Sequence, residues 1–198
     1  MKKICFIILF LVPTLTFADI CKRNEAILNY LEKVTKKKCH LISVKELAEI
    51  DTIDLIGKKV TTLNKNDLQG LSKLNWLRLG SNQIEHLEDD LFLENPNIKF
   101  LGLSNNRIKK LSAKTFAPLS QLEKVNFDQN QIEIIEEGTF KYSVKLKAIS
   151  LNNNKIKNLP SHFLSNNLDI DYLSIVNNPI DQNEIQTIKN RHPKIKSK

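Results

Sequence analysis

The feature that most constrains this chain is a repeat of 24 residues. Leucine-like residues recur at this spacing, at Ile50, Leu74, Ile98, Leu122, Leu146 and Ile170. Further apolar residues fall at fixed offsets within each unit, and the third unit reads IKFLGLSNNRIKKLSAKTFAPLSQ. A single unit of this kind cannot bury its own apolar face, whereas stacked copies can. The period therefore predicts a solenoid, a fold that offers a long open surface for binding.

The units share the pattern LxxLxLxxNxIxxLxxxxFxxLxx, in copies that keep the same phase. This pattern resembles the leucine-rich repeat, in the 24-residue form common in extracellular proteins, and the layout is similar to that of small secreted bacterial repeat proteins. The resemblance implies an α/β repeat fold, a curved solenoid with a parallel β-sheet on its concave side. We expect five full units and one partial unit over residues 50–180.

The first 18 residues have the features of a secretory signal peptide. Lys2 and Lys3 are followed by an almost wholly apolar run, Ile4 to Val12, and Ala18 offers a small residue for cleavage. The apolar run is too short for a permanent membrane span, and no second run follows it. We therefore expect an exported protein, secreted or periplasmic, without a membrane span.

Residues 19–49 do not follow the period and are predicted to form a helical N-terminal cap. Ile27, Leu28, Leu31 and Val34 share one helical face, and a second short helix begins at Ser43. Cys21 and Cys39 are an even pair in an exported chain, which favours a disulfide worth about 3 kcal/mol on the chain-entropy estimate. Two unpaired thiols or metal ligands are the alternatives.

Two columns of repeated residues have structural roles. An asparagine where each coil leaves its strand has both donors and acceptors for the backbone of adjacent coils, which predicts a hydrogen-bonded ladder. Phe92, Phe116 and Phe140 are predicted to stack on the convex side. Some units depart from the repeat pattern. Lys58 occupies the asparagine position of the first unit, and in other units a polar residue replaces the last leucine of the pattern. The ladder comprises Asn82, Asn106, Asn130, Asn154 and Asn178, and the polar replacements are Asn95, Ser143 and Asn167.

Residues 181–198 are predicted to form a C-terminal cap and a basic tail. Ile185 and Ile188 lie on an otherwise polar segment that suits a short helix. Asp181 or Asn183 is positioned to cap the helix, and Pro193 to end it. Lys194 to Lys198 form the tail.

The outward-facing strand positions supply the candidate binding site, because alternate residues of a strand point to opposite faces. Trp76 and Phe100 are neighbours in this scheme, and Trp and Arg are enriched at binding hot spots. Our hypothesis is that a protein partner binds the concave face. The alternative for Trp76 and Phe100 is a cross-strand packing pair without a ligand. The expected contact residues are Trp76, Arg78, Phe100, Lys124, Asp128 and Tyr172.

Other classes of function have less support in the sequence. No nucleophile elbow, phosphate loop or zinc-protease motif is present, and the four histidines are scattered, so we expect no enzyme, metal site or cofactor. The net charge is +8. Dispersed basic runs at 36–38, 58–59 and 109–110 leave a second hypothesis, a binder of an anionic cell-surface polymer or envelope component. We expect no nucleic-acid partner and a monomer.

Overall fold

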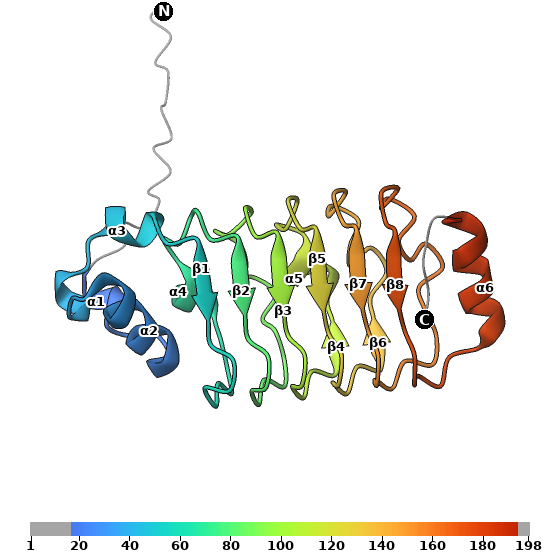
Figure 1. The fold of residues 1–198 in the computed structure, drawn as a ribbon, viewed down its shortest axis with the longest axis horizontal. Coiled ribbons are helices and arrows are strands. Elements are labelled where there is room, and N and C mark those ends of the chain that lie inside the picture. Colours follow the sequence, from blue (N-terminus) through green and yellow to red (C-terminus); the bar gives the residue numbers. More distant parts are fainter. Residues whose placement is uncertain (1–16, 194–198) are drawn as a thin grey trace, which may run out of the picture.

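A computed structural model describes residues 17–193 of the chain, in which coils stack side by side between two helical caps (Figure 1). Apart from Phe17 and Ala18, the predicted signal peptide lies outside the described residues, as does the tail 194–198. No helix within 17–193 is both long enough and apolar enough to cross a membrane. Six short strands form the main sheet: β1 (Thr52–Asp54), β2 (Trp76–Arg78), β3 (Phe100–Gly102), β5 (Lys124–Asn126), β7 (Ala148–Ser150) and β8 (Tyr172–Ser174).

The strands pair in parallel and in sequence order, each with the strand one repeat further on. Trp76 lies opposite Phe100, and Phe100 opposite Lys124. This register of 24 confirms the predicted solenoid with a parallel sheet. The remaining elements of the coils are short: α4 (Lys65–Leu68), β4 (Lys110–Leu111), α5 (Ala113–Phe116) and β6 (Ile134–Ile135), of which β4 and β6 pair in parallel.

The core runs the length of the solenoid. Inward strand residues such as Leu77 are fully buried, and the convex side contributes the predicted phenylalanines. Phe116 lies 6.2 Å from Phe92 and 5.5 Å from Phe140 between ring centroids, tilted or edge-on rather than face to face. Phe163 continues the row, with its ring centroid 6.3 Å from that of Phe140. Each coil thus covers the apolar edge of its neighbour, as stacking requires.

The asparagine column forms a ladder of buried hydrogen bonds. In each case the amide oxygen accepts a backbone N–H of the preceding coil, as Asn106 does from Ile84 at 3.0 Å. The amide nitrogen donates to one carbonyl in the preceding coil, that of Leu79 for Asn106, and to two in its own coil, those of Leu103 and Ser104. The ladder starts at Asn82, and Lys58 in the first coil is exposed.

A second set of polar contacts lies on the convex side, where the sequence pattern breaks. Asn95, Ser143 and Asn167 replace leucine, yet all three are buried. Asn95 donates to the carbonyls of Leu68 and Leu71 at 3.1 Å, and Asn167 repeats this arrangement three coils later, with the carbonyls of Phe140 and Ser143. These replacements therefore join adjacent coils by hydrogen bonds and do not leave gaps in the packing.

The N-terminal cap closes the first coil with helices. Its elements are α1 (Phe17–Ile20), α2 (Glu25–Thr35), the 3-10 turn η1 (Cys39–Leu41) and α3 (Val44–Ala48). A disulfide joins Cys21 to Cys39, with their Cα atoms 5.2 Å apart. Ser43 and Glu46 form the reciprocal capping box at the start of α3. The predicted apolar face of α2 is only partly correct, because Ile27 and Leu31 are buried whereas Val34, in the last turn, is 45% exposed.

Arg23 and Tyr30 attach this cap to the first coil. Arg23 is buried and donates to the carbonyls of Asp67 and Gln69, and burial lowers its pKa to about 10. The Tyr30 hydroxyl donates to the Thr52 carbonyl at 2.9 Å, on the outer edge of β1. This contact occupies one carbonyl of the strand edge, and covering an edge in this way is how proteins limit strand addition.

The C-terminal cap is α6 (Gln182–Arg191), which packs Ile188 against the last coil. Asp181 caps it by accepting the backbone N–H of Asn183 at 2.6 Å. His192, directly after the helix, is buried.

Candidate functional site on the concave face

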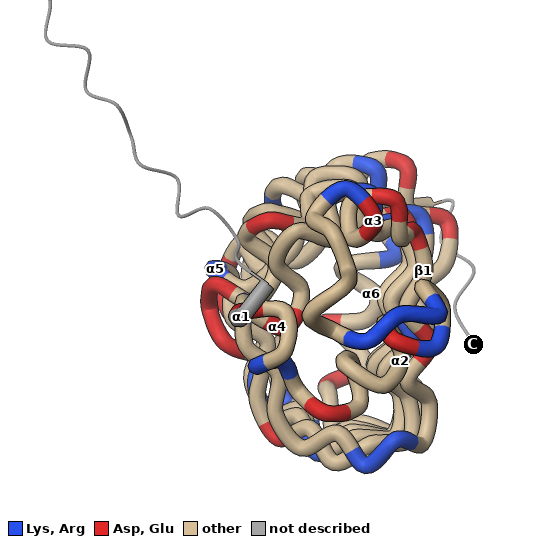
Figure 2. The backbone as a smooth tube through the Cα atoms, turned by 90° about the vertical axis from the view of Figure 1, so that its left-hand side faces the viewer, with Lys and Arg blue, Asp and Glu red and all other residues tan. Residues whose placement is uncertain are grey.

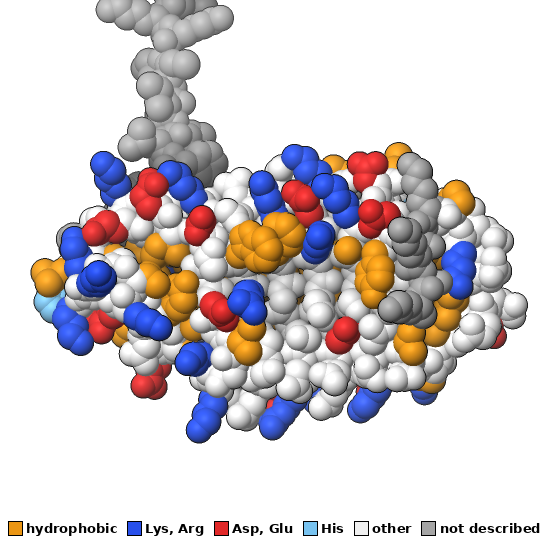
Figure 3. Space-filling view, viewed as in Figure 1, with side chains coloured by type: hydrophobic (Ala, Val, Ile, Leu, Met, Phe, Trp, Pro, Cys, Tyr) orange, Lys and Arg blue, Asp and Glu red, His pale blue; other side chains and the backbone are white. Residues whose placement is uncertain are grey.

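An aromatic cluster lies on the concave sheet at β2 and β3. The rings of Trp76 and Phe100 stack with centroids 3.8 Å apart and planes inclined by 23°. Lys124 continues the row from β5, with its Nζ 5.8 Å from the Phe100 centroid. Trp76 remains 42% exposed, and the cluster is visible over β2 and β3 in Figure 3. The residues are thus both a packing pair and an exposed apolar surface.

A shallow hollow adjoins this cluster. It has a volume of about 240 Å³, and its lining includes Gly102 as well as Arg78, Phe100 and Lys124. Arg78 forms an ion pair with Asp54 at 2.7 Å, on the neighbouring strand β1. Lys124 has no carboxylate partner within 17–193. The hollow therefore combines an aromatic wall with two cations, of which one is already paired.

Asp128 belongs to a polar network on the other half of the face. Its carboxylate accepts the Ser150 hydroxyl at 2.6 Å and the Asn152 backbone N–H at 2.7 Å. Asn152 in turn accepts the Ser174 hydroxyl at 2.7 Å and the Val176 backbone N–H at 2.8 Å. These bonds hold the side chains in fixed positions across three coils.

The structure brings only some of the predicted contact residues together. Trp76, Arg78, Phe100 and Lys124 form one cluster, whereas Tyr172 is half-buried on β8, three strands beyond β3. The network around Asp128 was not predicted from the sequence. Its signal is present, because Asp128 and Ser150 are 22 residues apart, the same offset that separates Asn106 from its backbone donor.

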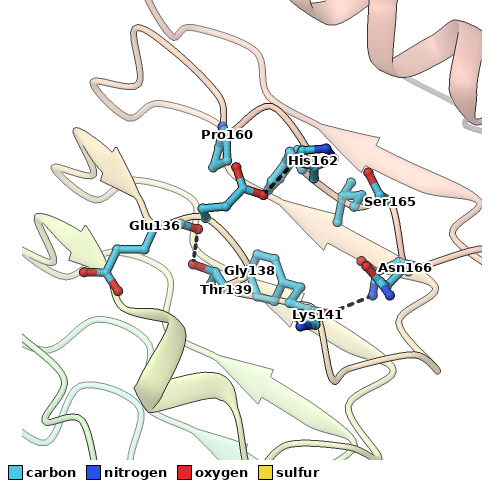
Figure 4. A pocket seen from close by; sticks show the side chains of 13 residues that line it. Glu136, Gly138, Thr139, Lys141, Pro160, His162, Ser165 and Asn166 are labelled. Atoms are coloured by element: carbon cyan, nitrogen blue, oxygen red, sulfur yellow. Dashed lines mark hydrogen bonds and ion pairs between the residues drawn. The ribbon is translucent and has the colours of Figure 1, made fainter.

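The convex side carries a different hollow, of about 360 Å³, between the fourth and fifth coils (Figure 4). Phe140 and Phe163 form its apolar part, and His162 and Glu137 meet at its rim at 3.5 Å. Both rim side chains are more than half exposed, so this pair is solvated. In the described part of the chain, no group of three or more His, Cys, Asp or Glu side chains is placed to hold a metal ion.

Comparison with known proteins places this geometry in a known class. A family model for the leucine rich repeat matches residues 72–132. No curated protein matches the chain significantly.

Solved structures with the same fold include internalin C2 from Listeria monocytogenes, at 23% identity and a TM-score of 0.72, covering 88% of this chain and 74% of that one. A leucine-rich-repeat protein of Leptospira interrogans has 22% identity and a TM-score of 0.70, covering 82% of this chain. A chain of the LRIM1/APL1C complex has 19% identity and a TM-score of 0.64 over 70% of this chain. This chain spans only 39% of the Leptospira protein and 25% of the LRIM1/APL1C chain.

The stacked parallel coils, the family match over residues 72–132 and the shared fold of these solved structures show that the chain has a leucine-rich-repeat fold.

Proposed function

We propose that this protein is an exported recognition module that binds a protein partner through its concave face. Proteins with this fold are generally interaction modules, and one similar solved structure is itself a complex, LRIM1/APL1C. The observation that carries the proposal is Trp76, which is the single tryptophan of the chain and lies exposed on a sheet rather than in the core. The disulfide is compatible with export.

The mechanism is rigid display of side chains. Backbone pairing fixes the strands, stacking fixes the Trp76 and Phe100 rings, and hydrogen bonds fix Asp128. Because these groups are already ordered, a partner loses little conformational entropy of the binding surface when it docks. The proposed contact is centred on Trp76, Arg78, Phe100 and Lys124, with Asp128 and Tyr172 toward the other end. The protein would act as a monomer and without catalysis.

The alternative of a polyanion binder based on dispersed lysines has weaker support. Several basic side chains are paired with carboxylates of the adjacent cap or coil, as Lys73 is with Glu49 of the cap at 2.6 Å and Lys147 with Glu123 of the preceding coil at 3.0 Å. Such pairing reduces the charge available to a polymer. Binding that falls steeply between about 50 and 200 mM salt would favour the polymer.

The test is a crosslinking pull-down that compares the native protein with Trp76→Ala. Truncation of a hot-spot tryptophan should reduce capture of the partner. In a titration with the captured partner, it should weaken the binding free energy by more than about 1 kcal/mol. The matched control is Leu168→Ala, which removes an apolar side chain that is 77% exposed and lies outside the strands of the concave sheet. Equal capture by the native protein and Trp76→Ala would remove the aromatic cluster from the site.

A further inference from the structure

A separate cleft of about 900 Å³ lies between cap helix α2 and the first coil. Helix α2 contributes Lys33, and the first coil contributes Lys58 and Lys59, so basic residues that are distant in sequence line one hollow. Figure 2, viewed from the cap end, shows basic segments close to both α2 and β1. The basic run at 58–59 was expected to be one of several dispersed runs, whereas in the structure it lines the same cleft as Lys33 of the docked cap.

The lysine pair of the first coil results from the end of the asparagine ladder. Lys58 occupies the ladder position, but no earlier coil offers backbone groups for an asparagine to bond, and the side chain is exposed. Gly57 and Lys59 both adopt positive φ, at 68° and 59°, in the turn that carries Lys58. The first coil therefore places two adjacent cations where later coils bury an amide.

The charge of the cleft is predominantly positive. All three lysines are exposed and none has an ion-pair partner within 17–193. The acidic side chains of the lining are Glu25 and Asp54, and Asp54 already pairs with Arg78. The cleft thus carries three unpaired cations against one unpaired carboxylate.

The same lining is also apolar. Leu55 and Val60 are buried beneath it, and Ile56 is 42% exposed. The Tyr30 hydroxyl is not an open donor, because it is bonded to the Thr52 carbonyl. Recognition in this cleft therefore rests on lysine charge next to exposed aliphatic surface.

We infer that this cleft binds an acidic polypeptide segment in which carboxylate and apolar side chains alternate. Carboxylates would meet Lys33, Lys58 and Lys59, and an apolar side chain would cover Ile56. A sulfated sugar chain supplies the charge but no apolar side chain for Ile56, and a single phosphate is far smaller than the space. The site is independent of the proposed contact at Trp76, and it offers a second point of attachment next to it.

The test is a titration of the isotopically labelled protein with the blocked peptide acetyl-GELELELG-amide, followed by backbone amide NMR. Shifts are expected at residues 25–33 and 54–61, and a glutamine analogue of the peptide should leave them unchanged. Replacing Lys33, Lys58 and Lys59 with Gln should weaken binding by about tenfold, as expected when three exposed ion pairs of modest strength are lost together. A control with the same loss of charge replaces Lys109, Lys157 and Lys189, which lie outside the cleft, and should retain native affinity.

The inference would be overturned by equal loss in both triple variants, by equal binding of the glutamine analogue, or by tighter binding of a sulfated oligosaccharide in the same cleft. The variant Trp76→Ala separates the two sites, since it should leave peptide binding intact. A loss there would show that the peptide binds the concave cluster instead, and would also contradict the inference. Failure of the cleft does not affect the partner pull-down that tests the concave face.

Discussion

Replacement of one central ladder asparagine gives the sharpest test of how the coils are held together. In Asn106→Ala, the Ile84 backbone N–H loses its acceptor. The Leu79 carbonyl keeps a second donor from Asn82 at 2.8 Å, and the Leu103 carbonyl keeps one from Asn130 at 2.9 Å. The Ser104 carbonyl, which accepts from Asn106 at 3.3 Å, keeps the Ser81 backbone N–H. The variant therefore leaves one buried donor wholly unpaired and three carbonyls with one bond fewer.

These losses translate into a substantial change in the free energy of unfolding. An unpaired buried donor costs about 1–3 kcal/mol, and each further hydrogen bond contributes about 1 kcal/mol at most where the carbonyl keeps a partner. We expect Asn106→Ala to lower stability by about 3 kcal/mol. The terminal variant Asn178→Ala should cost about 1 kcal/mol, because Asn178 is half-exposed and water reaches its partners.

Urea unfolding followed by circular dichroism measures both values. If the slope of the unfolding free energy against urea concentration is unchanged, the variant still unfolds as one cooperative unit. Asn97→Ala serves as a surface control, since its single bond to the Ser72 carbonyl is exposed, and should change stability by less than about 0.5 kcal/mol. Equal costs for Asn106→Ala and Asn178→Ala would refute the argument that burial of the ladder determines its contribution.

Three further outcomes are expected. Replacing Cys21 and Cys39 with Ser should lower the free energy of unfolding by about 3 kcal/mol. The variant should melt at a lower temperature than the oxidised protein, and reductant should not change its melting temperature. Phe116→Ala should cost about 3–5 kcal/mol in urea unfolding, because the ring is buried between Phe92 and Phe140. Burial and, secondarily, the charge of Arg191 lower the pKa of His192 in the folded protein, so the unfolded chain binds a proton more readily. The stability contributed by the neutral, buried His192 is therefore complete above the unfolded pKa of about 6.5 and is lost as the pH falls through the lower folded pKa. Melting temperatures between about pH 8 and 5 should therefore fall less in His192→Gln than in the native protein.

The period predicted the fold because every coil repeats the same burial pattern. Strand register, the asparagine column and the aromatic row follow from residues 24 apart, and the capping box at Ser43 follows from local spacing. The same periodicity predicted that Trp76 and Phe100 are neighbours on the outside of the sheet.

Features that depend on how the cap meets the first coil were not predictable in this way. Arg23 bonds to carbonyls more than 40 residues away, and Lys33 lines the same cleft as Lys58 only because α2 docks there. The exposure of Val34 has the same origin, since the helix face alone does not indicate where the neighbouring coil ends. The bonds of the polar residue Asn95 were also not predictable, because a sequence column does not show that carbonyls of the preceding coil lie within reach.

Hydrogen exchange of the protein with and without its captured partner tests the concave-face proposal most directly. We expect slower exchange in the partner complex at 76–78, 100–102 and 124–126, the strands that carry the aromatic cluster and Lys124. Protection confined to 136–142 and 160–167, around the convex hollow, would contradict it.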